Sequence, residues 1–278
     1  MTREEYWEKQ NKWFRRQQDD YFRMNWHNAF YDIDWREIPI FIINRNRLSI
    51  GFTDLVNWLL YTDSCQSKET SLQRRAVRSK ITVIDNGSTY PPLLQYYKDS
   101  GLHVQYMEHN GGPWVFWEKE LYKQVFTPYI VTDADLAPDK GCPSDIIQKL
   151  LFILKSHTPQ QIVKVGPGLR IDNLPDHYNR KDYMRQCEAP FNQEKMRRNR
   201  SNSRWIVEGT PDMFLGGIDT TFCMYRPGAP FVNGPNNYRL AAPYVFEHRP
   251  WYIDSSNPPE EDNYYRQHAE NGWSSGLC

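Results

Sequence analysis

Short apolar runs alternate along the first half of the chain with stretches that have a helical pattern. Continuous apolar runs rich in β-branched residues are typical of strands that are buried on both faces of a parallel sheet. Four such strands are predicted, at residues 38–43, 81–84, 103–107 and 129–132. Helical patterns lie between them, through residues 55–60, 92–99 and 117–125. This alternation predicts βαβ units and an α/β fold with a mainly parallel sheet flanked by helices.

The second half of the chain has a less regular pattern. It predicts a helix at 144–155, a strand within 162–166, a strand or hairpin at 213–225 around two glycines, and a short helix within 260–269. The polar and basic stretch 179–204 predicts a mobile loop.

Residues 2–30 predict an amphipathic helix ahead of this alternation. Trp7, Phe14 and Tyr21 recur at heptad spacing and would form an aromatic stripe along it. The stripe is expected to pack on the same domain, with a partner protein or a membrane surface as alternatives. We therefore expect a helical extension over residues 1–35 and a single domain over 36–278.

The composition excludes several function classes. The 34 basic and 34 acidic residues cancel, so no overall field favours binding to nucleic acid or to an anionic membrane. No apolar run approaches the roughly 20 residues of a transmembrane segment. The odd number of cysteines, five, without a Cys-x-x-Cys pair, favours free thiols in a reducing compartment. We expect a soluble, cytoplasmic protein.

Asp133, Ala134 and Asp135 follow the fourth predicted strand directly. In an extended segment the two aspartates point to the same side, so they share one site. Hard carboxylate oxygens suit Mg²⁺ or Mn²⁺ that bridges to a phosphate. An isolated Asp-x-Asp is more often a solvated turn that caps a helix. Here its place after a buried strand favours the cation site, because ligands of such sheets bind beyond the carboxyl ends of the strands.

Asp85 ends the second predicted strand in the equivalent way. Its carboxylate can accept hydrogen bonds from a base or a ribose. An Asx-turn in the segment 85–88 is the equal alternative.

Several blocks of this sequence form a recognisable series: 84–89, 110–112 and 132–135, and further 88–94, 164–166, 171–178, 218–222 and 248–252. In this order and spacing they resemble the GT-A-fold glycosyltransferases, in particular the family 2-like group. The resemblance covers residues 38–270 and is specific to small bacterial and viral enzymes of that group. The resemblance includes capsid-glycan transferases of large algal viruses. A viral enzyme of this kind would be expected in the cytoplasm of the host cell.

The resemblance implies a GT-A-type, Rossmann-like domain with an added N-terminal helix. Its nucleotide-sugar half would span about 36–140 and its acceptor half about 141–278. It implies a metal-dependent hexosyl- or pentosyltransferase that uses Mn²⁺ or Mg²⁺ and a nucleotide-sugar donor, expected to be a UDP-sugar, with a glycan or glycoprotein as acceptor.

The resemblance also assigns roles to individual residues. Asp85 would contact the uracil or ribose, Asp133 the ribose or metal, and Asp135 the metal. His248 would complete the metal shell, or else be a structural histidine beside Arg249. The remaining donor-binding positions are Asn44, Arg47, Gly112 and Lys164.

An inverting transfer needs a general base on the acceptor side, and Asp219 is the preferred candidate, with Glu208 and Asp212 in reserve. The alternative interpretation is that Asp219 is a carboxylate at a strand edge or in a turn, without a role in catalysis. Lys164 and Arg170, with the basic residues 197–200, would clamp the diphosphate or form a solvated face. Trp114, Trp117 and Trp251 are candidates for sugar stacking or for the core.

Two other functions compete with this one. A sugar-phosphate nucleotidyltransferase would share the sheet and metal, but needs a glycine-rich loop after the first strand, and segment 44–48 contains no glycine. The other is a non-catalytic module that binds nucleotides or carbohydrates.

Overall fold

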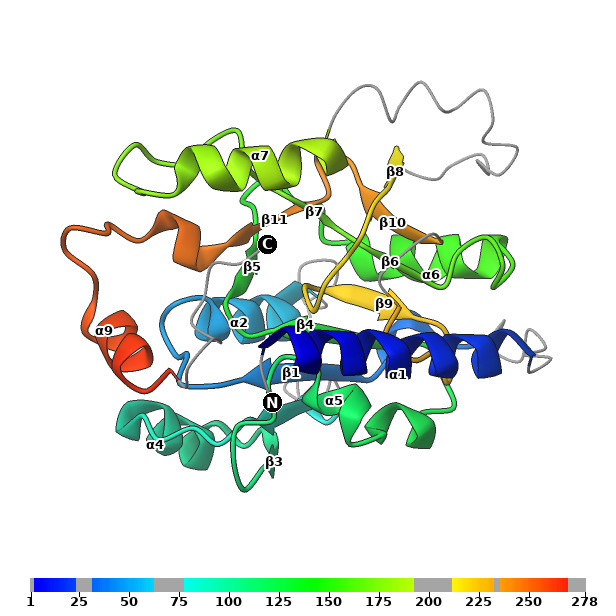
Figure 1. The fold of residues 1–278 in the computed structure, drawn as a ribbon, viewed down its shortest axis with the longest axis horizontal. Coiled ribbons are helices and arrows are strands. Elements are labelled where there is room, and N and C mark those ends of the chain that lie inside the picture. Colours follow the sequence, from blue (N-terminus) through cyan, green and yellow to red (C-terminus); the bar gives the residue numbers. More distant parts are fainter. Residues whose placement is uncertain (1–2, 24–31, 63–77, 193–211, 233–235, 270–278) are drawn as a thin grey trace.

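The central sheet has eight strands in the order β3-β2-β1-β4-β9-β6-β10-β8 (Figure 1). The structure is a computed structural model and describes residues 3–23, 32–62, 78–192, 212–232 and 236–269. The strands of this sheet are β1 (Ile40–Asn44), β2 (Ile81–Asp85), β3 (His103–Tyr106), β4 (Tyr129–Asp133), β6 (Lys164–Gly166), β8 (Met213–Leu215), β9 (Cys223–Tyr225) and β10 (Asn237–Leu240). The predicted α/β fold with a mainly parallel sheet is confirmed.

The first four strands form a parallel unit with β1 at its centre. Strand β1 pairs with β2 on one side and with β4 on the other. The registers place Asn44 opposite Asp85, and Ile43 opposite Asp133. The polar residues that end these three strands therefore lie level at one edge of the sheet.

The second half of the sheet is mixed. Strand β9 runs antiparallel between β4 and β6, β10 is parallel to β6, and β8 is antiparallel at the outer edge. A separate three-stranded sheet joins β5 (Leu136–Pro138), β11 (Val245–His248) and β7 (Gly168–Leu169), in the order β5-β11-β7. Because β5 begins just after the two aspartates and β11 ends at His248, this small sheet brings His248 to the edge where β4 ends.

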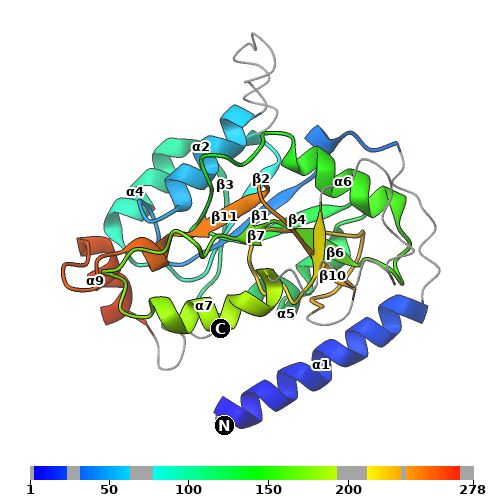
Figure 2. The same cartoon turned by 90° about the horizontal axis from the view of Figure 1, so that it is seen from above.

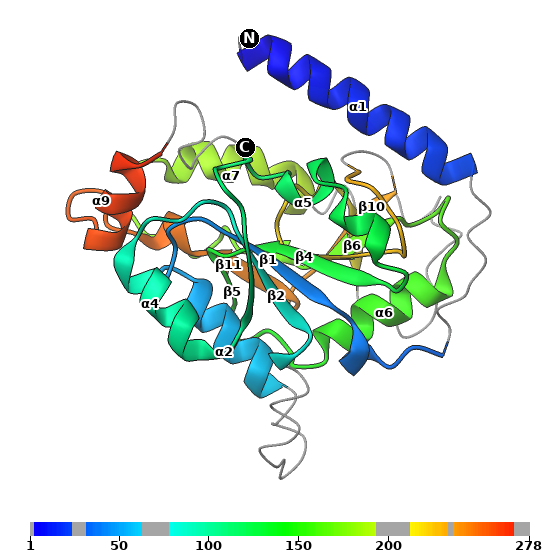
Figure 3. The same cartoon turned by 90° about the horizontal axis from the view of Figure 1, so that it is seen from below.

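Helices cover both faces of the central sheet, because its buried strands are apolar on both sides. One face packs on α2 (Phe52–Thr62), α4 (Pro91–Ser100) and α6 (Ile146–Ser156) through a core that includes Ile42, Val83 and Ile130. The other face packs on α5 (Val115–Glu118) and η2 (Leu121–Gln124). Figures 2 and 3 show α2, α4 and α6 on one side, and α1 and α5 on the other.

The N-terminal helix α1 (Arg3–Arg23) packs on the domain through its aromatic stripe. Phe14 and Tyr21 are buried, and the Phe14 ring lies 4.8 Å from Phe231 and 5.6 Å from Trp114 between centroids. Gln17 accepts a hydrogen bond of 2.8 Å from the Tyr122 hydroxyl. Phe14 and Tyr21 of the stripe are thus part of the core.

Three local predictions are wrong. Within 179–204, where a loop was expected, residues 181–192 form the helix α7 (Lys181–Asn192). The helix expected at 117–125 is divided into α5 and η2 at Glu120, whose φ of 56° is left-handed. Strands β8 and β9 form no hairpin, since β6 and β10 lie between them.

The remaining elements are η1 (Trp35–Glu37), η4 (Arg249–Tyr252) and α9 (Glu260–Gln267). No helix among the described residues is long and apolar enough to span a membrane.

Candidate active site at the carboxyl edge of the sheet

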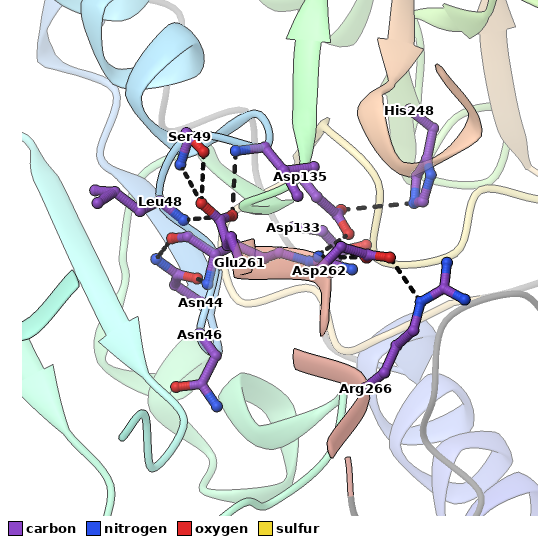
Figure 4. A network of polar contacts seen from close by, with 12 residues as sticks. Asn44, Asn46, Leu48, Ser49, Asp133, Asp135, His248, Glu261, Asp262 and Arg266 are labelled. Atoms are coloured by element: carbon purple, nitrogen blue, oxygen red, sulfur yellow. Dashed lines mark hydrogen bonds and ion pairs between the residues drawn. The ribbon is translucent and has the colours of Figure 1, made fainter. Parts of the chain in front are cut away.

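Asp133, Asp135 and His248 meet where strands β4 and β11 end (Figure 4). Asp133 is the last residue of β4, and Asp135 lies in the turn that leads to β5. The Nε2 atom of His248 is 3.5 Å from the Oδ1 atom of Asp135. The structure therefore brings together the three residues expected to hold a metal.

The carboxylate of Asp133 is held in an electrostatically unfavourable place. Its Oδ2 accepts a 2.8 Å hydrogen bond from the Thr220 hydroxyl. Desolvation by the surrounding protein raises the pKa of Asp133 well above its ordinary value, and the charge of Asp135 raises it further. A bound cation would relieve both effects.

The backbone of Asp135 is fixed from two sides. Its carbonyl oxygen accepts a 2.8 Å hydrogen bond from the Arg249 amide. Gly51 lies against its other side, so closely that a Cβ atom at Gly51 would be 2.6 Å from the carbonyl carbon of Asp135. Gly51 also has a φ of 99°, a conformation that side chains disfavour.

His248 is suited to be a neutral ligand. Burial lowers its pKa, and the opposing effect of Asp135 is smaller. Its Nδ1 is buried without a hydrogen-bond partner among the described residues. Its ring lies 4.8 Å from that of Trp251, which holds the imidazole at the edge of the small sheet.

Among the described residues, no group of three or more His, Cys, Asp or Glu side chains is arranged so that it could hold a metal ion by itself. Asp135 and His248 nevertheless stand close enough to serve as two ligands of one cation, whose other ligands would come from a bound diphosphate or water. Two adjacent ligands in an octahedron stand about 3 Å apart, at metal distances of roughly 2.1 Å. The 3.5 Å between His248 Nε2 and Asp135 Oδ1 is close to that spacing, so a small shift would bring both onto one ion.

Asn44 is the last residue of β1, and Arg47 lies in the loop that follows. The two side chains have different contacts. The Asn44 side chain closes the loop on itself through hydrogen bonds with the main chain of Arg47. Arg47 is buried, with its Nη1 3.0 Å from Asp262 and its Nε 3.9 Å from Asp135. Asn44 thus shapes the loop, and Arg47 lies directly beside the aspartate pair.

Asp85 is buried at the end of β2. It accepts hydrogen bonds from the Ser88 amide at 3.1 Å and from the Tyr97 hydroxyl at 3.2 Å. The first of these bonds goes to the amide three residues on, whereas an Asx-turn would use the amide two residues on, so Asp85 fixes its own loop without forming an Asx-turn. Asp85 lies one strand from Asn44 and two strands from Asp133, within the same edge.

Gly112 belongs to a turn that is bound to the loop after β2. Its carbonyl oxygen accepts a 2.9 Å hydrogen bond from Asn86, whose Oδ1 also accepts from the Gly111 amide. With a φ of 79°, Gly112 has the left-handed conformation that glycine favours. The turn and the Asp85 loop therefore form one unit.

Asp219 lies next to Thr220, the residue that holds Asp133. Desolvation raises its pKa, and the charge of Lys164 partly offsets this rise. Its side chain is nevertheless exposed, which leaves it accessible to a substrate. Asp219 thus lies near enough to Asp133 for its charge to raise the pKa of that residue further.

Lys164 is fully buried behind this segment. Its Nζ donates to the carbonyl oxygen of Ile218 at 2.5 Å and contacts the Tyr225 hydroxyl at 3.1 Å. Burial lowers its pKa to about 8. Lys164 therefore supports the Asp219 segment from within, and is not arranged to reach a donor diphosphate directly.

The other candidates play smaller parts. Trp114, Trp117 and Trp251 are buried and belong to the core or its margin, so they offer no open face to a sugar. Arg170 is paired with Asp139 and Asp172. Asp212 is exposed, and its carbonyl oxygen accepts a hydrogen bond from Ala241. Glu208 and the basic residues 197–200 lie outside the described residues.

Sequence reasoning missed the acidic residues of α9. The short helix itself was expected, but Glu261 and Asp262 read as ordinary acidic residues of a first helical turn. Both are buried against the loop after β1. The only signal was the clustering of acids and tyrosines at 260–265, and no local pattern shows where such a helix docks.

The three cysteines within the described residues, Cys142, Cys187 and Cys223, are free, in agreement with the expectation of free thiols.

The sequence matches no protein-family model and no curated protein. Among solved structures, the chain is similar to a mannosyltransferase from Pyrobaculum calidifontis in complex with GDP-Man and Mn²⁺, with 14% identity, a TM-score of 0.31, and coverage of 49% of this chain and 36% of that chain. It is also similar to S. aureus TarS 1–349, with 16% identity, a TM-score of 0.32, and coverage of 51% and 39%.

A third similar structure is GalNAc-T7 with UDP, GalNAc and Mn²⁺, at 11% identity and a TM-score of 0.40, with coverage of 76% of this chain and 43% of that chain. The chain spans less than half the length of each of these three proteins.

Proposed function

We propose that the protein is a metal-dependent glycosyltransferase that moves a sugar from a nucleoside diphosphate donor to a hydroxyl group of a glycan or glycoprotein. One observation carries the proposal: Asp133, Asp135 and His248 converge at the carboxyl edge of a parallel sheet, level with Asp85. Open α/β sheets bind their ligands at that edge. Two of the three similar structures are complexes, one with GDP-Man and Mn²⁺ and one with UDP, GalNAc and Mn²⁺.

In this proposal, Asp133, Asp135 and His248 hold Mn²⁺ or Mg²⁺. The cation supplies positive charge that stabilises the departing diphosphate. Asp85, in the adjoining loop, accepts hydrogen bonds from the ribose or the base, with UDP as the preferred nucleotide. Asn44 keeps the loop after β1 in the shape that leaves this edge open.

Asp219 is proposed as the general base. Its carboxylate would take the proton of the acceptor hydroxyl while that oxygen attacks the anomeric carbon and the bond to the diphosphate breaks, which inverts the configuration. A raised pKa makes a carboxylate a stronger base, and the direction of the shift at Asp219 agrees with this role. Its accessibility fits an acceptor that enters from the second half of the sheet.

The rival nucleotidyltransferase activity is less well supported. Its phosphate loop would follow β1, and here the amides of Leu48, Ser49 and Ile50 all donate to the carboxylate of Glu261. That loop is therefore filled by the protein's own side chain. A purely binding module would have no need of an accessible carboxylate such as Asp219 near the aspartate pair.

The experiment is to incubate the protein with Mn²⁺ and a panel of UDP- and GDP-sugars, and to measure thermal stabilisation and slow hydrolysis of the donor. We expect Mn²⁺-dependent stabilisation by at least one donor. D135N should lose metal-dependent donor binding, and D219N should keep binding but lose transfer. D99N, an exposed change on α4, is the matched control and should behave as the wild type. No metal-dependent response to any donor would reject the proposal, and full turnover by D219N would reject its base.

The viral origin and the capsid role stay predictions of the sequence resemblance.

A further inference from the structure

The C-terminal helix α9 is fastened to the loop after β1 by a buried carboxylate. Glu261 accepts hydrogen bonds from the amides of Leu48, Ser49 and Ile50 at 2.9, 2.7 and 3.1 Å, and from the Ser49 hydroxyl at 2.7 Å. Figure 4 shows Glu261 directed at this loop. Four donors on one buried carboxylate fix the loop in one conformation, because releasing it would leave a charge without partners.

The next residue of α9, Asp262, holds Arg47. Their side chains are only 2% and 3% exposed, and the Nη1 to Oδ1 distance is 3.0 Å. Tyr265, one turn further, covers the guanidinium group with its ring, whose centroid is 3.8 Å from the Cζ atom. Arg47 is therefore held on the side of α9.

Arg47 lies at the same time beside the proposed metal site. Its Nε is 3.9 Å from Asp135 Oδ2, beyond hydrogen-bond distance, and its Nε and Nη2 have no hydrogen-bond partner among the described residues. A guanidinium that has two unused donors near a carboxylate would form a bidentate pair with it unless held back. Such a pair would occupy the oxygens of Asp135 that a cation needs.

We propose that Glu261 and Asp262 form a clamp that holds Arg47 in a loose ion pair with Asp135, at 3.9 Å, and prevents a bidentate hydrogen-bonded pair, and that they are thereby positioning residues for the metal site. This inference rests on the proposed function. Asp262 binds the guanidinium group, and Glu261 fixes the loop that carries Arg47 and continues into Gly51, which lies against the backbone of Asp135.

The clamp also reduces charge repulsion. The positive charge of Arg47, 3.9 Å from Asp135, opposes the binding of a divalent cation at that carboxylate. The negative charge of Asp262, which pairs with Arg47 at 3.0 Å and also with Arg266 at 2.6 Å, offsets part of this repulsion. Loss of Asp262 should therefore weaken metal binding both by repulsion and by occupation of Asp135.

The test is the Kd for Mn²⁺, measured by electron paramagnetic resonance on D262N. We expect an affinity about 10- to 100-fold weaker than that of the wild type, the range usual for residues that orient metal ligands. At saturating Mn²⁺, kcat should stay within about threefold of the wild type, because the chemistry is unchanged once the ion is bound. The matched control is E260Q, the same kind of change at the exposed neighbouring residue, which should leave the Kd unchanged.

The double variant R47M/D262N separates the clamp from a merely structural role. If Arg47 is what blocks the site, removing it should restore the Mn²⁺ affinity to within about threefold of R47M alone. A structural defect would persist in the double variant. If D262N fails to fold, E261Q is the second variant, and it should weaken Mn²⁺ binding in the same direction.

A wild-type Kd in D262N, or no rescue in R47M/D262N, would overturn the clamp alone. A wild-type protein that bound no Mn²⁺ would overturn the proposed function and the clamp with it.

Discussion

Replacing Gly51 by alanine should displace the proposed metal ligand Asp135 without touching any side chain of the site. The added Cβ would lie 2.6 Å from the carbonyl carbon of Asp135 and 2.7 Å from its Cα. Ordinary contact begins at 3.4 Å, so one of the two backbones must move by about 0.8 Å (3.4 − 2.6). Since Asp135 is also tied to Arg249 and the loop of Gly51 to Glu261, neither side can move freely.

The magnitude has two parts. The φ of 99° at Gly51 costs an alanine roughly 1–2 kcal/mol. The overlap adds about 1–3 kcal/mol, the usual cost of overpacking a closed site. We expect a loss of about 2–5 kcal/mol in the free energy of unfolding. A ligand displaced by nearly 1 Å should also lower metal-dependent turnover by about 100-fold.

The assay combines urea denaturation with donor turnover in Mn²⁺. The matched control is G101A, because Gly101 also has a positive φ, 66°, while a Cβ there would meet only Arg78 at 3.6 Å. G101A should lose about 1 kcal/mol and no activity. If G51A were as active as G101A, or no less stable, the close packing of Gly51 on Asp135 would not be what positions this residue.

Two further predictions concern the core. Burial lowers the pKa of Lys164 to about 8, so between pH 8 and 10.5 the unfolded chain binds more protons at this residue than the folded chain. The free energy of unfolding of the wild type, relative to that of K164M, should therefore rise with pH by up to about 3 kcal/mol. Urea titrations of both proteins across that range would contradict this prediction if the difference stayed constant. F14A should lower the free energy of unfolding by about 3 kcal/mol, because it removes the ring that packs on Phe231. The control E8A, on the exposed face of α1, should change it by less than about 0.5 kcal/mol. Equal effects of the two variants in chemical denaturation would show that α1 is not held by its aromatic stripe.

The parallel half of the fold was predictable because its strands carry their own signal. The runs that became β1, β2 and β4 are apolar on both faces, and each ends in a polar residue. Since parallel strands end at one edge, Asn44, Asp85 and Asp133 had to lie together once the alternation was recognised.

The second half was less predictable because its strands are short and pair at long range. Strands β6 and β9 have three residues each, too few for any periodicity. Strand β9 pairs with β4 and β6, and β6 pairs in addition with β10, which begins more than 70 residues after β6 starts. The polar and basic composition of 179–204 as a whole concealed α7, a helix whose buried face includes Met184 and Glu188.

For the site, the sequence identified the residues that meet at the carboxyl edge better than those that support them. His248 was placed correctly beside Asp135, although only pairing of β11 with β5 brings them together. Lys164 was expected to reach a donor, but its position inside a buried strand directs its Nζ to Ile218 instead. Supporting contacts of this kind depend on tertiary packing and leave no local pattern.

The central claim is that a cation and a nucleoside diphosphate bind together at the aspartate pair. The most direct measurement is calorimetric titration of the wild-type protein with UDP and with GDP, once in Mn²⁺ and once in EDTA. We predict that the wild type binds at least one of the two nucleotides in Mn²⁺ and neither in EDTA. D135N should bind neither nucleotide under either condition. Equal binding in EDTA, or no binding of either nucleotide in Mn²⁺, would contradict it.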